Sequence, residues 1–239
     1  MGQMAVRLVQ SGFTGPSDGV NTTFSLVLGD GFNGEVAVQD LGQRWLLTEG
    51  YLKLYPTARY VHSAIDALHD LQAKAPRTIA IDEVADMEVR AYRLAAYLST
   101  QRPKDWFGAR FSIPFALATL MVGERSGLDA FGDEAVNDPR IVNLASKIRV
   151  IEEPSFSAVY PAQQRVDLSL TTLGGACFHG QCTITSGEPD RPHSDEALLH
   201  KFNDLAIPLW AESAASELRN AVLNMPACPD VSKLLHFLP

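Results

Sequence analysis

The sequence has 239 residues and a formal net charge of −8 at pH 7; 46% of its residues are hydrophobic and 20% are charged. This length and composition are typical of a globular protein with one large domain or two small ones. The negative charge argues against a nucleic-acid partner, because phosphate backbones bind basic surfaces. We find neither the long apolar run of a membrane-spanning helix nor the apolar core of a signal peptide. We therefore expect a cytoplasmic protein without membrane contact.

The three cysteines are too few, and odd in number, for a disulfide framework, which favours a reducing compartment. Cys177 and Cys182 flank His179, and these three side chains could bind a metal ion. Zinc sites usually combine two closely spaced ligand pairs, and the sequence has no second pair. We therefore interpret the two cysteines as strand thiols near a hairpin turn and expect no metal.

The first fifty residues are a poor start for an independent domain. Residues 1–11 can form a short amphipathic helix that ends at the turn sequence Gly12-Phe-Thr-Gly-Pro16. Residues 17–50 are rich in Gly, Asp and Asn, which predicts a long loop. We interpret residues 1–50 as the tail end of a helical domain followed by a linker.

A helix is predicted over residues 57–73. Pro56 suits the first turn of a helix and restricts the residue before it to an extended conformation. Apolar residues then recur at helical spacing and form one stripe. His62, Asp66 and His69 follow the spacing of a shared polar face on the other side.

Three basic side chains gather near the start of this helix: Lys53, Arg59 and His62. The first-turn N–H groups and the helix dipole also attract negative charge, so the segment favours an anionic ligand. The alternative is that Lys53 and Arg59 are solvated and that His62 is an ordinary surface or satisfied histidine.

The remaining elements alternate irregularly between strands and helices, which favours an α+β fold over a doubly wound sheet. We assign residues 51–194 to a small mixed α/β domain, and residues 195–239 to closing helices that return to an incomplete all-helical domain. The predicted strands are residues 78–82, 87–92, 149–152, 164–172 and 181–185, and the predicted helices are residues 109–123, 138–147, 195–209 and 212–223.

Five short motifs follow one another along the chain. They are Gly12-Phe-Thr-Gly-Pro16, Lys53-Leu-Tyr-Pro56 with His62, Ala109-Arg-Phe-Ser-Ile-Pro-Phe-Ala116 with Gly123, Asp138-Pro-Arg-Ile141 with Lys147, and Gly187-Glu-Pro189 with Lys201-Phe202. In this order, they resemble the motifs of the MmgE/PrpD family. The resemblance covers about residues 5–210, and its specificity comes from the order and spacing of the motifs.

The resemblance implies an enzyme of small di- and tricarboxylates that uses neither a metal nor an organic cofactor. Family members are usually homodimers with a large helical domain and a smaller α+β domain, and the active site lies between the two. By position, the resemblance makes Lys53 and His62 the catalytic residues, with Lys53, Arg59 and Tyr55 binding the substrate.

The sequence departs from the family at two positions and in extent. Some members have a catalytic histidine near the position of Ala58 and an active-site tyrosine at Phe115, and neither Ala nor Phe can transfer a proton. An acid/base histidine and aspartate from the family's N-terminal half have no counterpart here. We therefore expect little turnover by this chain alone, and either self-association or pairing with a separate N-terminal half.

Three functions remain open from the sequence. The first is a hydro-lyase that acts on a 2-methylcitrate-like tricarboxylate in propionate metabolism. The second is an isomerase or epimerase of a dicarboxylate, and nothing in this half separates it from the first. The third is a non-catalytic remnant that only folds, dimerises or binds a carboxylate.

Overall fold

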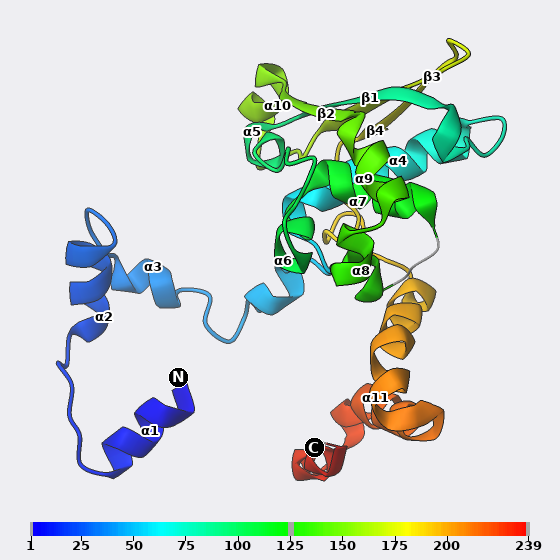
Figure 1. Ribbon diagram of the computed structural model, residues 1–239. Helices are drawn as coiled ribbons and strands as arrows, with labels where there is room; N and C mark the ends of the chain where they lie inside the picture. Colours follow the sequence, from blue (N-terminus) through cyan, green and yellow to red (C-terminus); the bar gives the residue numbers. More distant parts are fainter. Residues whose placement is uncertain (1, 124–126, 238–239) are drawn as a thin grey trace. The chain divides into compact units, whose positions relative to one another are not determined.

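The computed structural model describes residues 2–123 and 127–237, which form two compact units, Met1–Glu49 and Gly50–Pro239. Figure 1 shows the first unit in blue and the second in the remaining colours.

The first unit consists of short helices without a core. It contains the predicted N-terminal helix and four further short segments, so the long loop predicted for residues 17–50 is wrong in part. No described residue of the unit is buried, and Leu26 and Leu47 are 80% and 92% exposed. Its apolar side chains therefore have no interior to stabilise them. The segments are α1 (Gly2–Gln10), α2 (Gly19–Thr22), a π-helix (Thr23–Val27), α3 (Gly34–Val38) and a 3-10 helix (Leu46–Glu49).

The second unit is built on a mixed four-stranded sheet, which confirms the predicted α+β class. The strand order is β2-β1-β3-β4; β1 and β2 are parallel, and the other two pairs are antiparallel. The strands are β1 (Val84–Ala91), β2 (Ile148–Glu152), β3 (Val166–Thr172) and β4 (Cys177–Cys182).

Two strand predictions need correction. The strand predicted at residues 78–82 is absent: this stretch leads into a 3-10 helix, Ile81–Glu83. The Glu83 carboxylate accepts hydrogen bonds from Ala80 N and from the Arg77 guanidinium, and these local bonds favour a turn over an extended ladder. The strand predicted at residues 181–185 begins earlier, at Cys177, because the hairpin turn through Gly175 (φ +83°) is short.

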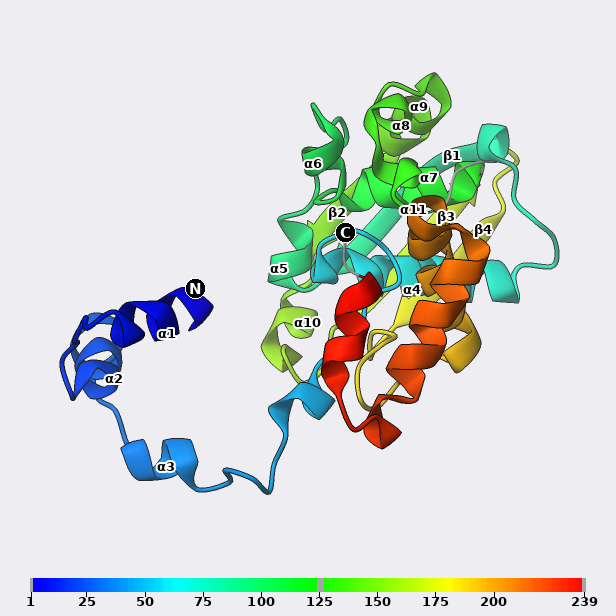
Figure 2. The same ribbon diagram turned by 90° about the horizontal axis from the view of Figure 1, so that it is seen from below.

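Helices cover one face of the sheet. Figures 1 and 2 show α4 (Arg59–Lys74) along β3 and β4, with α7 (Ile113–Val122) beside it. Because α7 contacts both α4 and β2, the two helices lie on the same face. The strands alternate accordingly: in β3, Val166, Leu168 and Leu170 are buried, and the residues between them are partly exposed.

The helix ends follow the capping residues. The Ser112 hydroxyl accepts a hydrogen bond from Phe115 N at the start of α7, and Gly123 ends that helix with φ +70°, as predicted. Asp138 caps α9 (Pro139–Ser146) in the same manner. The other helices are α5 (Arg93–Ala96), α6 (Trp106–Ala109), α8 (Asp133–Val136) and α10 (Pro154–Val159).

The last long helix, α11 (Asp195–Leu223), consists of two helical segments, as predicted. Pro208 cannot donate a helical hydrogen bond, and three residues later Ala211 has φ 60° and ψ 166°, which interrupts the helix. No helix in the described ranges is both long and apolar enough to cross a membrane.

β4 approaches α4 closely at Gly180. A Cβ atom at this position would lie 2.1 Å from Ala67 O and 2.6 Å from Leu71 N, both in the backbone of α4. A side chain at residue 180 would therefore push α4 away from the sheet.

We expect Gly180→Ala to lower the free energy of unfolding by about 1–3 kcal/mol, because backbone atoms of α4 cannot yield as a flexible side chain would. Urea unfolding monitored by circular dichroism measures the effect. Gly174→Ala is the matched control, since the nearest atom to its new Cβ is 3.9 Å away. Equal stabilities of the two variants would contradict the tight packing of β4 on α4.

Candidate functional site

The segment before α4 carries Lys53 and is fixed by the loop that follows β4. Leu52 N donates a hydrogen bond to Gly187 O at 3.0 Å, and Leu52 O lies 3.2 Å from His193 Nε2. Gly187 has φ +90°, and a Cβ atom at this position would lie 2.0 Å from Leu52 O. Only glycine therefore allows this approach, and the position of Lys53 depends on it.

Lys53 is half-buried, and its ammonium group donates a hydrogen bond to Thr57 O at 3.0 Å. Among the residues that the structure describes, no carboxylate forms an ion pair with it. Lys201 of α11 donates a hydrogen bond to Lys53 O. The backbone of Lys53 is thus held from α11, while its cationic end lacks an acidic partner.

Arg59 is engaged in the protein's own structure. Its guanidinium donates hydrogen bonds to Glu188 Oε1 at 2.6 Å and to Ser186 O at 2.9 Å, and the side chain is only 10% exposed. It also lies 4.5 Å from the centre of the Tyr51 ring. Because Glu188 compensates its charge, a substrate carboxylate would have to compete with an existing ion pair. The substrate-binding role of Arg59 stays a prediction.

His62 is buried, whereas the i, i+4, i+7 spacing predicted only that it shares a polar face with Asp66 and His69. Its Nδ1 lies 3.2 Å from Ala58 O and 3.3 Å from the Thr57 hydroxyl. A hydrogen on Nδ1 satisfies the Ala58 carbonyl and leaves the lone pair on Nε2. Nε2 is buried without a hydrogen-bond partner in the described chain. Burial lowers the pKa of His62 to about 4, although the bond to Ala58 O opposes the shift; the charges of Arg59 and Lys53 add to the lowering.

Asp66, on the next turn of α4, anchors the loop. Its carboxylate accepts hydrogen bonds from Ser186 N at 2.6 Å and from Arg191 Nη1 at 3.2 Å. His69 is exposed and lies 3.5 Å from the Tyr55 hydroxyl. The predicted polar face therefore divides into a buried histidine, a structural carboxylate and a surface histidine.

Tyr55 connects this region to a cavity of about 380 Å³. Its ring centre lies 5.8 Å from that of His62, and burial raises the pKa of its hydroxyl. Tyr55 lines this cavity, whereas Lys53 and His62 are not among its lining residues. The structure therefore brings Tyr55 and His62 together but places only Tyr55 in the cavity wall. The walls are mainly apolar, with Leu54, Leu120, Phe131 and Leu205 among them, and His200, Lys201 and Asp204 of α11 add the polar groups.

The two family departures lie in structural positions. Ala58 is the N-cap of α4, and its N donates a hydrogen bond to Arg110 O at 2.8 Å. Phe115 is fully buried and packs against Phe131 at 6.2 Å between ring centres. Neither residue adds a proton-transfer group to the candidate site.

The side chains of the cysteine motif do not converge. Cys177 Sγ lies 3.5 Å from His179 Nε2, and both residues are exposed. Cys182 is buried on the opposite face of β4, where desolvation, together with the nearby Asp66, raises the pKa of its thiol to about 12. The described residues contain no group of three metal-ligand side chains.

Sequence reasoning missed the partners that hold the site: Glu188, His193 and Lys201. Glu188 and Lys201 belong to motifs quoted for the family resemblance, but no local pattern predicts their contacts with residues more than a hundred positions away. His193 carried no signal at all.

Comparison with known proteins matches residues 55–226 to the MmgE/PrpD C-terminal domain. The chain is 22% identical to a cis-aconitate decarboxylase of Aspergillus terreus over 213 residues, which cover 85% of this chain and 43% of that protein. It is also 22% identical over 203 residues to a cis-aconitate decarboxylase-like protein, oryM, of Aspergillus oryzae, covering 82% and 42%. The chain thus spans less than half the length of the relatives it matches.

The family match covers well over half of the chain and includes α4, the sheet and all of α11. The chain therefore belongs to the MmgE/PrpD family.

Proposed function

We propose that this chain supplies the carboxylate-binding part of a lyase that acts on a small tricarboxylate. The observation that carries the proposal is the ammonium group of Lys53, which has no acidic partner in the described structure although the protein carries eight more acidic than basic residues. An ammonium group has three donors, and among the described residues only one of those of Lys53 is bound, to Thr57 O. Two remain for a substrate carboxylate.

The relatives' names favour this class of substrate. They are a cis-aconitate decarboxylase and a decarboxylase-like protein, and cis-aconitate is a tricarboxylate. Dehydration of a 2-methylcitrate-like substrate and decarboxylation both start from a carbon beside a carboxylate. We therefore propose a lyase that breaks either the C–O bond of a dehydration or the C–C bond of a decarboxylation. We also propose that the working enzyme contains either a second copy of this chain or a separate helical polypeptide.

A second candidate is carboxylate binding without turnover. The specific observation in its favour is that Ala58 and Phe115 stand where some family members place proton-transfer groups, and that both have structural contacts here. Lys53 and His62 support the first candidate, because Lys53 can hold an anion and His62 Nε2 can accept a hydrogen bond or a proton.

The lyase proposal is tested by incubating the chain with 2-methylcitrate and with cis-aconitate, alone and mixed with the polypeptide encoded immediately upstream. We expect little product from the chain alone, and an unsaturated product, detected by proton NMR, from the mixture. Absence of product from a mixture of two folded polypeptides would contradict the lyase proposal; if citrate still bound, the second candidate would replace it.

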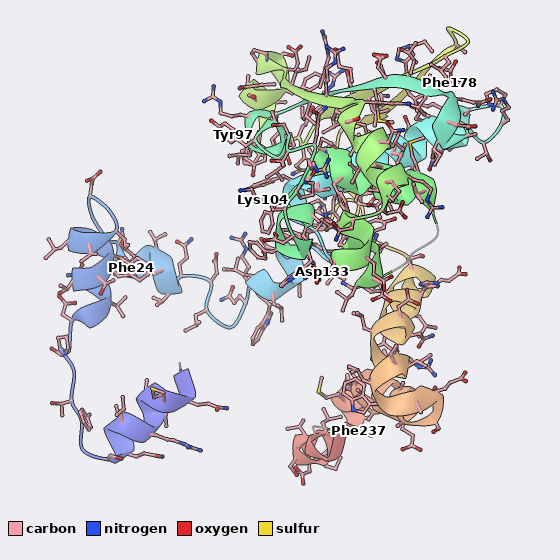
Figure 3. All side chains as sticks on the ribbon, in the orientation of Figure 1. Phe24, Tyr97, Lys104, Asp133, Phe178 and Phe237 are labelled. Carbon is pink, nitrogen blue, oxygen red and sulfur yellow. The ribbon has the colours of Figure 1, made fainter. Side chains whose placement is uncertain are left out.

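Lys53→Ala should weaken citrate binding roughly ten- to hundred-fold, because it removes a charge-assisted contact. Isothermal titration calorimetry measures the affinity. The exposed Lys104, labelled in Figure 3 in the loop before α6, provides the control variant Lys104→Ala, which should bind like the parent. Equal affinities of all three proteins would show that Lys53 does not bind the ligand.

Because His62 is buried and its pKa is lowered, we expect the free energy of unfolding to fall at mildly acidic pH. Its pKa is lowered from 6.5 to about 4, so the unfolded chain binds the proton more readily than the folded one. The contribution of neutral His62 to the free energy of unfolding is complete above pH 6.5. It falls by on the order of 3 kcal/mol as the pH falls toward 4.

Urea unfolding at several pH values and NMR titration of the His62 ring measure this effect. The neutral variant His62→Gln should lose the corresponding part of the slope between pH 6.5 and 4. A His62 ring that titrates near 6.5 in the folded protein would contradict its burial in the neutral form.

A further inference from the structure

Lys201 is a second half-buried lysine beside the candidate site. It lies near the start of α11, and its ammonium group donates a hydrogen bond to the backbone oxygen of Lys53, 148 residues earlier in the chain. Burial lowers the pKa of Lys201, and the charge of Lys53 lowers it further. The second effect requires that the two ammonium groups are close enough to repel each other.

Neither lysine of this pair is neutralised. Within residues 2–123 and 127–237, no Asp or Glu forms an ion pair with Lys53 or Lys201. Lys74, in contrast, lies 2.5 Å from Asp70 on the adjacent turn of α4. Two neighbouring cations without a counter-charge destabilise each other, and a bound anion would relieve this repulsion.

Both ammonium groups also have donors to spare. Lys201 uses one of its three N–H groups on Lys53 O, and Lys53 uses one on Thr57 O. Two donors remain on each, which suits a ligand with more than one carboxylate.

The cavity next to Lys201 can hold the rest of such a ligand. Lys201 and Tyr55 both line the cavity of about 380 Å³, most of whose walls are apolar. His200 and Asp204 line it as well, and His200 Nδ1 lies 3.1 Å from Asp204 Oδ2. Because Asp204 repels carboxylates, the anionic groups of a ligand belong on the Lys201 side of the cavity.

We infer that Lys201 is a second substrate-binding residue, and that its ammonium group and that of Lys53 together bind two carboxylates of one ligand. The inference rests on the proposed function and extends it: the ligand is a di- or tricarboxylate, and a monocarboxylate of the same size binds much more weakly. It also assigns to α11 a direct part in binding, in addition to its contact with the Lys53 backbone.

The test must separate two roles of Lys201: its positive charge and its hydrogen bond to the backbone of Lys53. Lys201→Gln keeps a donor for Lys53 O but removes the charge, whereas Lys201→Arg keeps both. We expect calorimetry with citrate as the probe to give roughly ten- to hundred-fold weaker binding for Lys201→Gln and near-parental binding for Lys201→Arg. Lys104→Gln is the surface control and should bind citrate like the parent.

A second measurement on the unaltered protein does not depend on folding of a variant. Acetylation of lysines by an activated ester, followed by mass spectrometry, should become slower at Lys53 and Lys201 when citrate is present, and should be unchanged at Lys104. Acetate at the same carboxylate concentration should protect neither residue.

The outcomes distinguish the inference from the proposed function. If Lys53→Ala weakens citrate binding but Lys201→Gln does not, Lys201 only supports the backbone and the inference is overturned, while the proposed function stands. Protection of Lys53 without protection of Lys201 leads to the same conclusion. If the parent protein binds neither citrate nor succinate, the proposed carboxylate site itself fails, and the inference fails with it.

Discussion

The ion pair between Arg59 and Glu188 joins the first turn of α4 to the loop after β4, and the geometry of the candidate site depends on this junction. Burying a guanidinium is costly unless its charge and its N–H groups are all compensated. Glu188 supplies the charge and Ser186 O accepts a second bond, whereas Arg59 Nε is buried without a hydrogen-bond partner among the described residues. Asp66 fixes the same loop to the next turn of α4 through Ser186 N. With the loop held at two points, Gly187 and His193 can fix the backbone on either side of Leu52, and the position of Lys53 follows.

In the candidate site, the positive charge and the group that can accept a proton belong to different residues. His62 remains neutral because burial and the nearby cations disfavour its charged form, so the positive charge available to a ligand resides on the lysines. Arg59 does not add to it, since Glu188 compensates its charge. Within the described residues, the candidate site therefore combines ammonium groups that have no acidic partner with an imidazole whose pKa is lowered.

The two departures from the family pattern, Ala58 and Phe115, also add no proton-transfer group to the candidate site. Ala58 caps α4, where its backbone contact to Arg110 O does not depend on the side chain, and Phe115 contributes an aromatic ring to the core against Phe131. Restoring a histidine or a tyrosine would place polar atoms among buried neighbours, which needs new hydrogen-bond partners. Under the proposed function, these two positions favour carboxylate binding over proton transfer.

The sequence by itself determined the elements whose causes are local. Ser112 and Gly123 define α7, the alternation of β3 defines its buried face, and the apolar stripe after Pro56 defines α4. The motif order also indicated the family. Local patterns gave a wrong strand at residues 78–82, because the Glu83 side chain accepts a backbone hydrogen bond that a strand would use for pairing. Only the tertiary structure decided that Arg59 is neutralised, that His62 is buried and that Lys201 meets Lys53. Each of these depends on contacts between residues far apart in the chain, and charge, burial and pKa are properties of those contacts rather than of residue type.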